Sequence, residues 1–388
     1  MITTIILFIV ILSILVFVHE MGHFMTARFF GVKAEEFGFG FPPRAWGIFK
    51  TKEGKWKNVK GAKQVEEEVP GTIYSVNWVP LGGFVKIKGE NGEDEGPESF
   101  ASKKIWQRAI ILLAGVTMNI VLAAVLISFG YMIGLPQALG DDISSMAKIE
   151  NEQIQIVQVL TNTPAQAANI KMGDVINNIN GVEFAKYEEL QAFVAERTGE
   201  ELIYNIKRGD EVMNINVVPA IIEETGVGGI GVAIAETGIV SYPWYLSIWE
   251  GIATTIFTTW AIIVAFYDLL KGIFIGQGVS ADIAGPIGIA ALTGQVAKMG
   301  FIYILQFTAI LSINLAIINA FPFPALDGGR ILFLIIEKLK GSPVKREIEA
   351  VVHNVGFALL MLLVLVVTFK DVARFGSTFR ALWEKIAG

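Results

Sequence analysis

Long apolar stretches alternate with two polar regions along the chain, and this pattern predicts the architecture. Apolar residues run from position 5 to position 18, interrupted by Ser13, and comparable runs occupy residues 109–133, 301–321 and 355–369. A transmembrane helix needs ~20 mostly apolar residues, because each residue rises ~1.5 Å and the hydrocarbon core is ~30 Å thick. We therefore predict a polytopic α-helical membrane protein with four transmembrane helices, an inserted α/β domain and a cytoplasmic, membrane-associated β-hairpin.

The predicted segments follow the alternation of apolar and polar sequence. In chain order they are a first transmembrane helix (1–30), a cytoplasmic loop with membrane-associated β-strands (31–104), a second transmembrane helix (105–134), an extracytoplasmic α/β domain (140–238), amphipathic surface helices (239–299), a third transmembrane helix with a Leu-Asp-Gly segment (300–330), a cytoplasmic helix or loop (331–354), a fourth transmembrane helix (355–370) and a C-terminal tail (371–388).

Composition and charge support this picture. With 53% hydrophobic residues, 18% charged residues and a mean hydropathy of +0.54, the chain is more apolar than a soluble protein. The net charge of -6 excludes a role in nucleic-acid binding, because no basic tail or helix offsets it. Twelve Lys or Arg residues lie between positions 31 and 104, and basic residues beside membrane segments mark the cytoplasmic side.

The apolar residues 246–266 need a separate argument, since hydropathy alone would count them as a span. With the 140–238 domain outside, one extra crossing would place the end of the 301–321 run on the opposite side of the membrane from His23. Asp327, which follows that run, could then not reach His23. We therefore predict an amphipathic surface helix or helix pair here.

Ionisable residues at the end of the first apolar run carry the candidate chemistry. His19-Glu20-x-x-His23 is the H-E-x-x-H pattern of zinc peptidases. Two His residues four apart project from one helix face and are able to share a metal ion, while Glu20 is placed to move a proton. Charged residues in a spanning helix cost ~2.5 to 3.5 kcal/mol each, so they are usually functional. We expect an intramembrane metal site.

The third metal ligand must be sought far away in the sequence. The chain has no Cys and three His residues, so the ligands are imidazoles and carboxylates. Asp327 follows Pro322 and Pro324, which end the third apolar helix, and irregular backbone at membrane depth is tolerated where it lines a cavity. A turn is the alternative for an Asp followed by two glycines. His353, just before the last span, is expected to be an interfacial residue.

The cytoplasmic loop contains a candidate substrate-holding strand. Its sequence is Pro-Leu-Gly-Gly-Phe-Val-Lys-Ile-Lys-Gly-Glu at residues 80–90, in which glycines allow close approach and Phe84, Val85 and Ile87 favour extended backbone. An exposed strand edge is able to hold an extended peptide by main-chain hydrogen bonds. A plain surface hairpin is the alternative.

The soluble region contains a recognition motif. Residues 163–176 read Thr-Pro-Ala-Gln-Ala-Ala-Asn-Ile-Lys-Met-Gly-Asp-Val-Ile, and residues 179–181 read Ile-Asn-Gly. This resembles the PDZ domains of bacterial periplasmic proteases. A PDZ groove binds an extended peptide or a C-terminus by strand addition, so the resemblance implies recognition or gating.

These motifs occur together in the order found in bacterial site-2 proteases. The order is the H-E-x-x-H helix, the strand at 80–90, the pair Gly115 and Asn119, one PDZ segment, and the stretch from Asn314 to Gly328. Over nearly its whole length the chain resembles intramembrane zinc metalloproteases of the regulator-of-sigma-E type. It departs from them in having one recognisable PDZ segment and Val116 where Pro is common.

The resemblance implies particular roles for the motif residues. It implies four transmembrane helices with both termini outside and a Zn²⁺ ion, and the residue roles are as follows: metal ligands His19, His23 and Asp327; catalytic base Glu20; substrate-binding residues Asn314, Asn319, Gly83, Phe84, Val85, Lys86 and Ile87.

The expected function is that of an intramembrane zinc endopeptidase. It would cleave pre-trimmed single-span membrane proteins, such as anti-sigma factors or remnant signal peptides, during regulated intramembrane proteolysis. The enzyme would lie in the bacterial inner membrane, with the PDZ domain outside and the active site near the cytoplasmic face. Two alternatives are a membrane-anchored zincin that cuts soluble or misfolded proteins, and a non-proteolytic metal-binding membrane protein. The second needs neither Glu20 nor a peptide-holding strand.

Overall fold

The computed structural model describes residues 2–61, 69–90, 96–140, 143–160, 162–209, 211–222, 226–276 and 284–387, without the side chains of residues 2, 274 and 374–387. The chain forms two compact units, one made of residues 1–127 with 251–388 and the other of residues 128–250. The first unit carries the predicted metal site, and the second corresponds to the inserted domain.

Helices dominate the first unit. Their bounds are α1 Ile2–Phe29, α2 Ile105–Ile133, α5 Trp244–Ile275, α6 Pro286–Met299, α7 Phe301–Ala320, α8 Asp327–Lys340 and α9 Arg346–Ala387, with a short 3₁₀ helix at Phe100–Ser102. Within the described residues, five helices are long and apolar enough to cross a membrane, namely α1, α2, α5, α7 and residues 346–373 of α9. The expected count of four is therefore not confirmed. The fifth candidate is α5, which contains residues 246–266.

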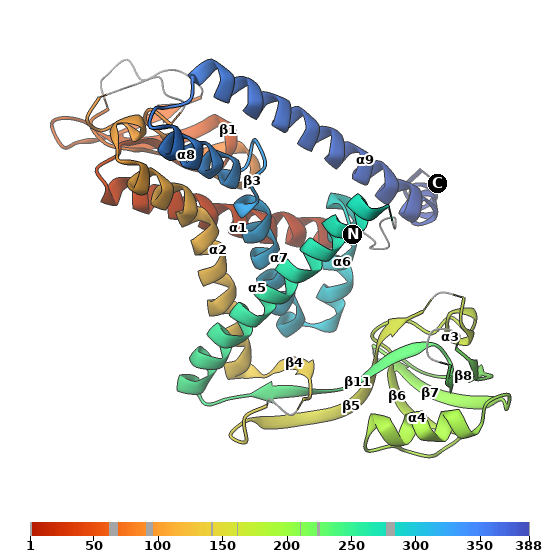
Figure 1. Ribbon diagram of the computed structural model, residues 1–388. Coiled ribbons are helices and arrows are strands. Elements are labelled where there is room, and N and C mark those ends of the chain that lie inside the picture. The colour runs from red at the N-terminus through yellow and green to blue at the C-terminus, as the bar shows by residue number, and fades with distance from the viewer. Residues whose placement is uncertain are drawn as a thin grey trace. The chain divides into compact units, whose positions relative to one another are not determined.

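The parity argument against a crossing by residues 246–266 did not take α6 into account, and these residues lie in a helix that is long and apolar enough to cross a membrane. Figure 1 shows α6 running back along α7, so that the two helices form an antiparallel hairpin joined at Gly300. The chain thus begins α6 and ends α7 at the same end of the hairpin. Because α6 runs back along α7, a crossing by α5 is compatible with Asp327 lying beside His23. The region holds one 32-residue helix and one 14-residue helix, and their placement at the membrane surface stays a prediction.

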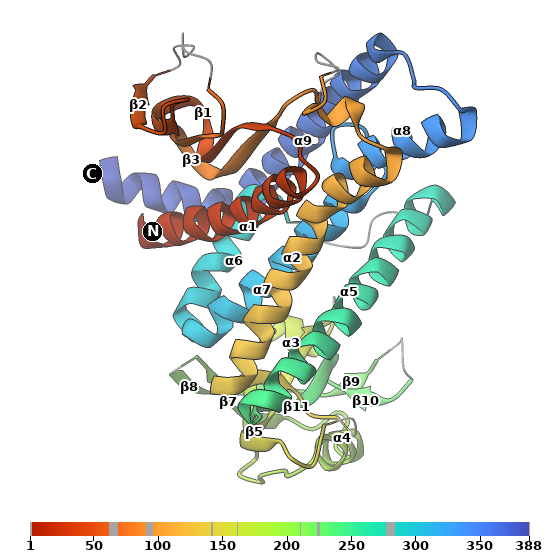
Figure 2. The ribbon, with the colours of Figure 1, turned by 90° about the vertical axis from the view of Figure 1, so that its left-hand side faces the viewer.

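A three-stranded antiparallel sheet replaces the simple hairpin expected in the cytoplasmic loop. Its strands are β1 Ala34–Lys50, β2 Trp56–Lys60 and β3 Ile73–Ile87, in the order β2-β1-β3. Residues 80–87 of the predicted strand lie in β3, at an edge of the sheet. Figure 2 shows the sheet beside α1. Phe37 of β1 stacks on Phe24 of α1 with ring centroids 4.5 Å apart, so apolar contacts hold the sheet to the metal-site helix.

The second unit is built on a six-stranded antiparallel sheet in the order β4-β11-β5-β6-β7-β8. The elements are β4 Leu135–Ala138, β5 Lys148–Val159, α3 Pro164–Ala167, β6 Val175–Ile179, α4 Tyr187–Glu196, β7 Leu202–Arg208, β8 Glu211–Val217, β9 Ala220–Ile221, β10 Gly228–Gly229 and β11 Val232–Ser241. Its core is apolar and includes Ile156, Ile179 and Tyr204. The buried Asp174 accepts two hydrogen bonds of 2.6 Å from Arg208, so the motif at 163–176 is tied to β7.

Buried contacts hold α8 against the helices that carry the site. A small apolar cluster joins Ala27 of α1, Ile87 of β3, Leu112 of α2 and Leu334 of α8. An ion pair of 2.5 Å between Arg108 of α2 and Glu337 of α8 closes one side of this cluster. Since α8 begins at Asp327, these contacts also set the place of the predicted third ligand.

Candidate active site

Helices α1 and α2 pack closely together, and this packing buries His19 and His23. A β-carbon at Gly22 would overlap the carbonyl oxygen of Ala114, and one at Gly115 would overlap Nε2 of His23. Only a residue without a side chain fits at either place. The H-E-x-x-H helix therefore lies directly against the backbone of α2, where His19 and His23 are each 6% exposed.

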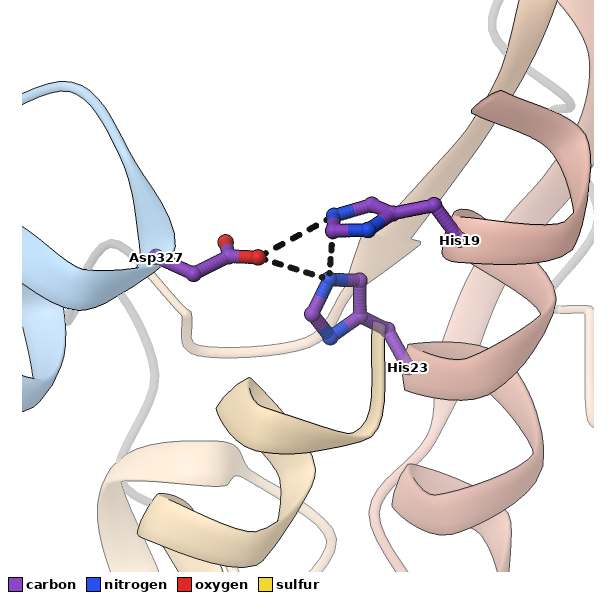
Figure 3. Close-up of side chains that lie close together, drawn as sticks. All are labelled: His19, His23 and Asp327. Carbon is purple, nitrogen blue, oxygen red and sulfur yellow. Dashed lines mark hydrogen bonds and ion pairs between the residues drawn. The ribbon is translucent and has the colours of Figure 1, made fainter. Parts of the chain in front are cut away.

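The structure brings His19, His23 and Asp327 together at one point (Figure 3). Oδ2 of Asp327 lies 3.0 Å from Nε2 of His19 and 3.3 Å from Nε2 of His23. The two Nε2 atoms are 3.2 Å apart. The three ligand atoms form a nearly equilateral triangle, although 304 positions separate His23 from Asp327 (327 minus 23).

Hydrogen bonds on the far side of each imidazole fix which nitrogen faces this triangle. Nδ1 of His23 lies 2.8 Å from the carbonyl oxygen of Ile111, which accepts only if Nδ1 carries the proton. Nδ1 of His19 lies 3.4 Å from the amide of Asn119, whose Oδ1 has no other partner in the described structure. The two ends of an amide are exchanged by rotation, so Nδ1–H of His19 is able to donate to that oxygen. Both Nε2 atoms then present lone pairs.

This donor set fits a zinc ion. Three acceptors that face one another repel unless a cation lies between them, and Oδ2 of Asp327 is buried with no hydrogen-bond donor among the described residues. In a tetrahedral site with zinc–ligand bonds of ~2.1 Å, neighbouring ligand atoms lie ~3.4 Å apart, close to the three edges observed. His19, His23 and Asp327 would hold the ion and leave a fourth position open.

Glu20 lies between the metal triangle and the edge of β3. Its Oε2 accepts a hydrogen bond of 3.1 Å from the backbone N–H of Val85. Val85 pairs with Phe37 of β1 on its other side, so this N–H belongs to the open edge of the sheet. The carboxylate and the predicted substrate strand are thus immediate neighbours.

Ser13 and a glycine pair hold β3 against α1. The hydroxyl of Ser13 donates to the carbonyl oxygen of Pro80 at 3.0 Å and accepts from the N–H of Gly82 at 3.2 Å. A β-carbon at Gly83 would lie 3.0 Å from Cα of Phe17, so these backbones touch. The strand edge is therefore fixed against the part of α1 that lies two to six residues before His19.

The remaining predicted substrate residues lie outside the metal triangle. Lys86 is paired with Glu35 at 2.8 Å and its side chain is 64% exposed, so it points away from the site. Asn314 donates to the carbonyl of Ile310 in its own helix at 3.0 Å. Asn319 is half-buried one residue before the end of α7. A role of these side chains in binding substrate stays a prediction.

Two contributions to the site escaped the sequence reasoning. The carbonyl of Ile111 orients His23, and no side-chain pattern signals a backbone acceptor. The hydroxyl of Ser312 in α7 donates to the main-chain oxygen of Asn119 at 2.7 Å, which ties α7 to the helix that orients His19. For Asn119 the sequence did carry a signal, since an Asn in a span needs a partner.

Known proteins resemble the chain along most of its length. The model of Peptidase family M50 matches residues 7–60 and 59–363. The regulator of sigma-W protease RasP of Bacillus subtilis is 30% identical over 459 aligned residues, covering 96% of this chain and 99% of that protein. Zinc metalloprotease RasP of Geobacillus kaustophilus is 30% identical over 455 residues, covering 96% and 98%.

A solved PDZ domain of an SdrC-like protein from Listeria monocytogenes is 24% identical, with a TM-score of 0.21, and covers 22% of this chain and 92% of that domain. The family match agrees with a buried two-His, one-Asp site beside a glutamate on membrane-spanning helices. The chain therefore belongs to Peptidase family M50 and is a membrane-embedded zinc metalloprotease.

Proposed function

We propose that the chain is an intramembrane endopeptidase that cleaves single-span membrane proteins within or next to their transmembrane segments. Pre-trimmed anti-sigma factors and remnant signal peptides are the substrate classes that fit, in keeping with the name of the sigma-W protease relative. The cleavage would form part of regulated intramembrane proteolysis. One observation carries the proposal: the metal triangle and the open edge of β3 meet at Glu20.

In this proposal Glu20 is the catalytic base. When bound, zinc supplies Lewis acidity toward a water molecule and the scissile carbonyl. Oε2 of Glu20 is the carboxylate oxygen nearest the strand edge, since it already accepts the N–H of Val85. It would take the proton of the attacking water and deliver it to the leaving amine, as a general base and then a general acid.

The edge of β3 supplies a way to hold a substrate that has lost its helix. The carbonyl groups in a transmembrane helix are bonded within the helix, so they must be freed before hydrolysis. Residues 83–87 offer main-chain donors and acceptors to an extended segment, and this replaces the hydrogen bonds lost on unwinding. Asn314 and Asn319 are proposed as further polar contacts for that segment.

The inserted domain is proposed as a gate that screens substrates. Its antiparallel sheet and the motif at 163–176 support a PDZ-like fold, which accepts an extended peptide or a C-terminus. The basic loop at 31–104 supports an orientation with the active site near the cytoplasmic face of the bacterial inner membrane and the inserted domain outside. In this orientation, a bulky outer domain on an untrimmed substrate would meet the gate first.

A cleavage assay with purified protein tests the proposal. The substrates are a single-span transmembrane peptide in detergent or vesicles and unfolded casein in solution. We expect cleavage of the transmembrane peptide, no cleavage by Glu20→Gln, and one bound zinc in both proteins. Cleavage of casein alone would favour a membrane-anchored zincin. Full activity of Glu20→Gln would overturn the assignment of the base.

A further inference from the structure

The loop that carries Asp327 has a backbone conformation that needs external support. Residues 321–326 connect α7 to α8, and Ala325 in this loop has φ of +79°, in the left-handed region that residues with a side chain rarely adopt. Such a conformation persists only where neighbouring structure imposes it. Asp327 lies two residues further on, so whatever fixes Ala325 also fixes the carboxylate.

His353 of α9 supplies one of the supporting contacts. Its Nδ1 lies 2.9 Å from the backbone nitrogen of Ala325 and accepts that N–H. An imidazole nitrogen that accepts carries no proton, so the ring is neutral with its proton on Nε2, which faces Glu349 at 4.0 Å. The ring also lies against Phe333 of α8, with centroids 5.5 Å apart. His353 thus contacts both the loop and the helix that Asp327 begins.

Gly356 supplies a second contact from the same face of α9. It lies three residues after His353, which on a helix places both residues on one side. A β-carbon at position 356 would overlap Cβ of Pro324 and lie 2.7 Å from its carbonyl oxygen. The helix backbone therefore lies directly against the loop at the residue before Ala325.

From these contacts we propose that His353 is a positioning residue for the metal ligand Asp327, and that His353 and Gly356 together form a loop clamp. The inference rests on the proposed role of Asp327 as a ligand. The metal-binding group found in the described chain contains His19, His23 and Asp327, so His353 acts through the loop and not on the metal. The sequence had assigned this His to the membrane interface.

The clamp matters because a metal site tolerates little displacement. Ligand distances must hold within about 0.2 Å, and the loss of an outer partner typically lowers metal affinity or activity by ~10- to 100-fold. Without the acceptor on His353, the N–H of Ala325 loses its bond and the loop is free to leave the left-handed conformation. Oδ2 of Asp327 would then move relative to the two Nε2 atoms.

Three substitutions separate the acceptor from simple packing. In His353→Asn the side-chain oxygen occupies nearly the place of Nδ1 and keeps an acceptor for Ala325. In His353→Gln the polar group moves outward toward the place of Nε2, and in His353→Leu the acceptor is lost while bulk remains. Asn354→Leu is the matched control, since Asn354 is the next residue on α9 and is exposed.

The experiment uses the full-length protein in detergent and measures zinc release into a chelator together with the visible spectrum of the Co²⁺-substituted protein. We expect zinc release to be ~10- to 100-fold faster in His353→Leu and His353→Gln, with an altered Co²⁺ spectrum. His353→Asn and Asn354→Leu should match the parent. Adding Ala325→Gly to His353→Leu should restore part of the zinc retention, because glycine adopts positive φ without strain.

The outcomes distinguish this inference from the proposed function. If Asp327→Asn fails to weaken zinc binding, the ligand assignment fails and the clamp fails with it. If Asp327→Asn loses zinc but His353→Leu retains it like the parent, the clamp alone is refuted. Equal losses in His353→Asn and His353→Leu would also refute it, since the acceptor would then be irrelevant.

Discussion

Gly115→Ala is the sharpest test of the packing that builds the metal site. The new β-carbon would lie 2.8 Å from Nε2 of His19 and overlap Nε2 of His23, whereas ordinary contacts of this kind begin at 3.4 Å. To restore an ordinary contact, Nε2 of His19 would have to move away from the new β-carbon by about 0.6 Å (3.4 minus 2.8). A metal site tolerates about 0.2 Å, so the ligand triangle should break.

We expect Gly115→Ala to bind zinc ~100-fold more weakly and to lose cleavage of a transmembrane substrate. Overpacking between α1 and α2 should also lower the free energy of unfolding by ~1 to 3 kcal/mol. The assay is zinc stoichiometry by elemental analysis, paired with thermal unfolding in detergent. Thr117→Ala is the control, since this exposed residue of the same helix bonds its own backbone at Leu113.

Two outcomes would contradict the prediction for Gly115→Ala. If Gly115→Ala binds one zinc and cleaves at the parental rate, the close contact between α2 and the two rings does not exist as described. Loss of zinc in Thr117→Ala as well would show that any change in α2 disturbs the site, and the argument from the β-carbon would fail.

Two further substitutions probe the supports of the site, and a third probes the core of the inserted domain. Asn119→Leu removes the partner of His19 Nδ1 and should weaken zinc binding by ~10- to 100-fold, measured by competition with a chelator; unchanged affinity would contradict that role. Ser13→Ala frees the β3 edge and should raise KM for a transmembrane substrate by ~3- to 10-fold with little change in kcat, given ~1 kcal/mol per hydrogen bond; a fall in kcat alone would contradict it. Tyr204→Phe should stabilise the inserted domain by ~1 kcal/mol in thermal unfolding, because its buried hydroxyl has no partner in the described structure and burial raises its pKa; a loss of stability would point to a bound water.

The sequence predicts the metal ligands and the catalytic base better than the groups that hold them in position. His19, Glu20 and His23 form a local pattern whose helical geometry follows from spacing alone. Asp327 was one candidate among 37 acidic residues, and its role as a ligand came from the resemblance to site-2 proteases. The depth at which α1 and the start of α8 meet depends on packing between distant segments, and no local pattern encodes that contact.

The supporting groups could not be predicted for two physical reasons. The carbonyl of Ile111 is a backbone atom, so any residue at position 111 would provide it. His353 looked like an interfacial residue because polar residues precede it on the chain, and its bond to Ala325 exists only once α9 packs against the 321–326 loop. A residue that acts by position leaves no signature in a single sequence.

The fourth apolar helix extends beyond its predicted end, and Asp371 shows the physical reason. An acidic residue within an apolar stretch is ordinarily taken as its end, and the fourth span was predicted to stop at residue 370. In the structure α9 continues, and Asp371 is 5% exposed while its carboxylate accepts the N–H groups of Gly285 and Gly288 at 3.3 and 2.8 Å. These are free donors at the positive N-terminal end of α6, which is where a buried carboxylate is best satisfied. The residue that ended the predicted span therefore anchors α6, the helix that runs back along α7.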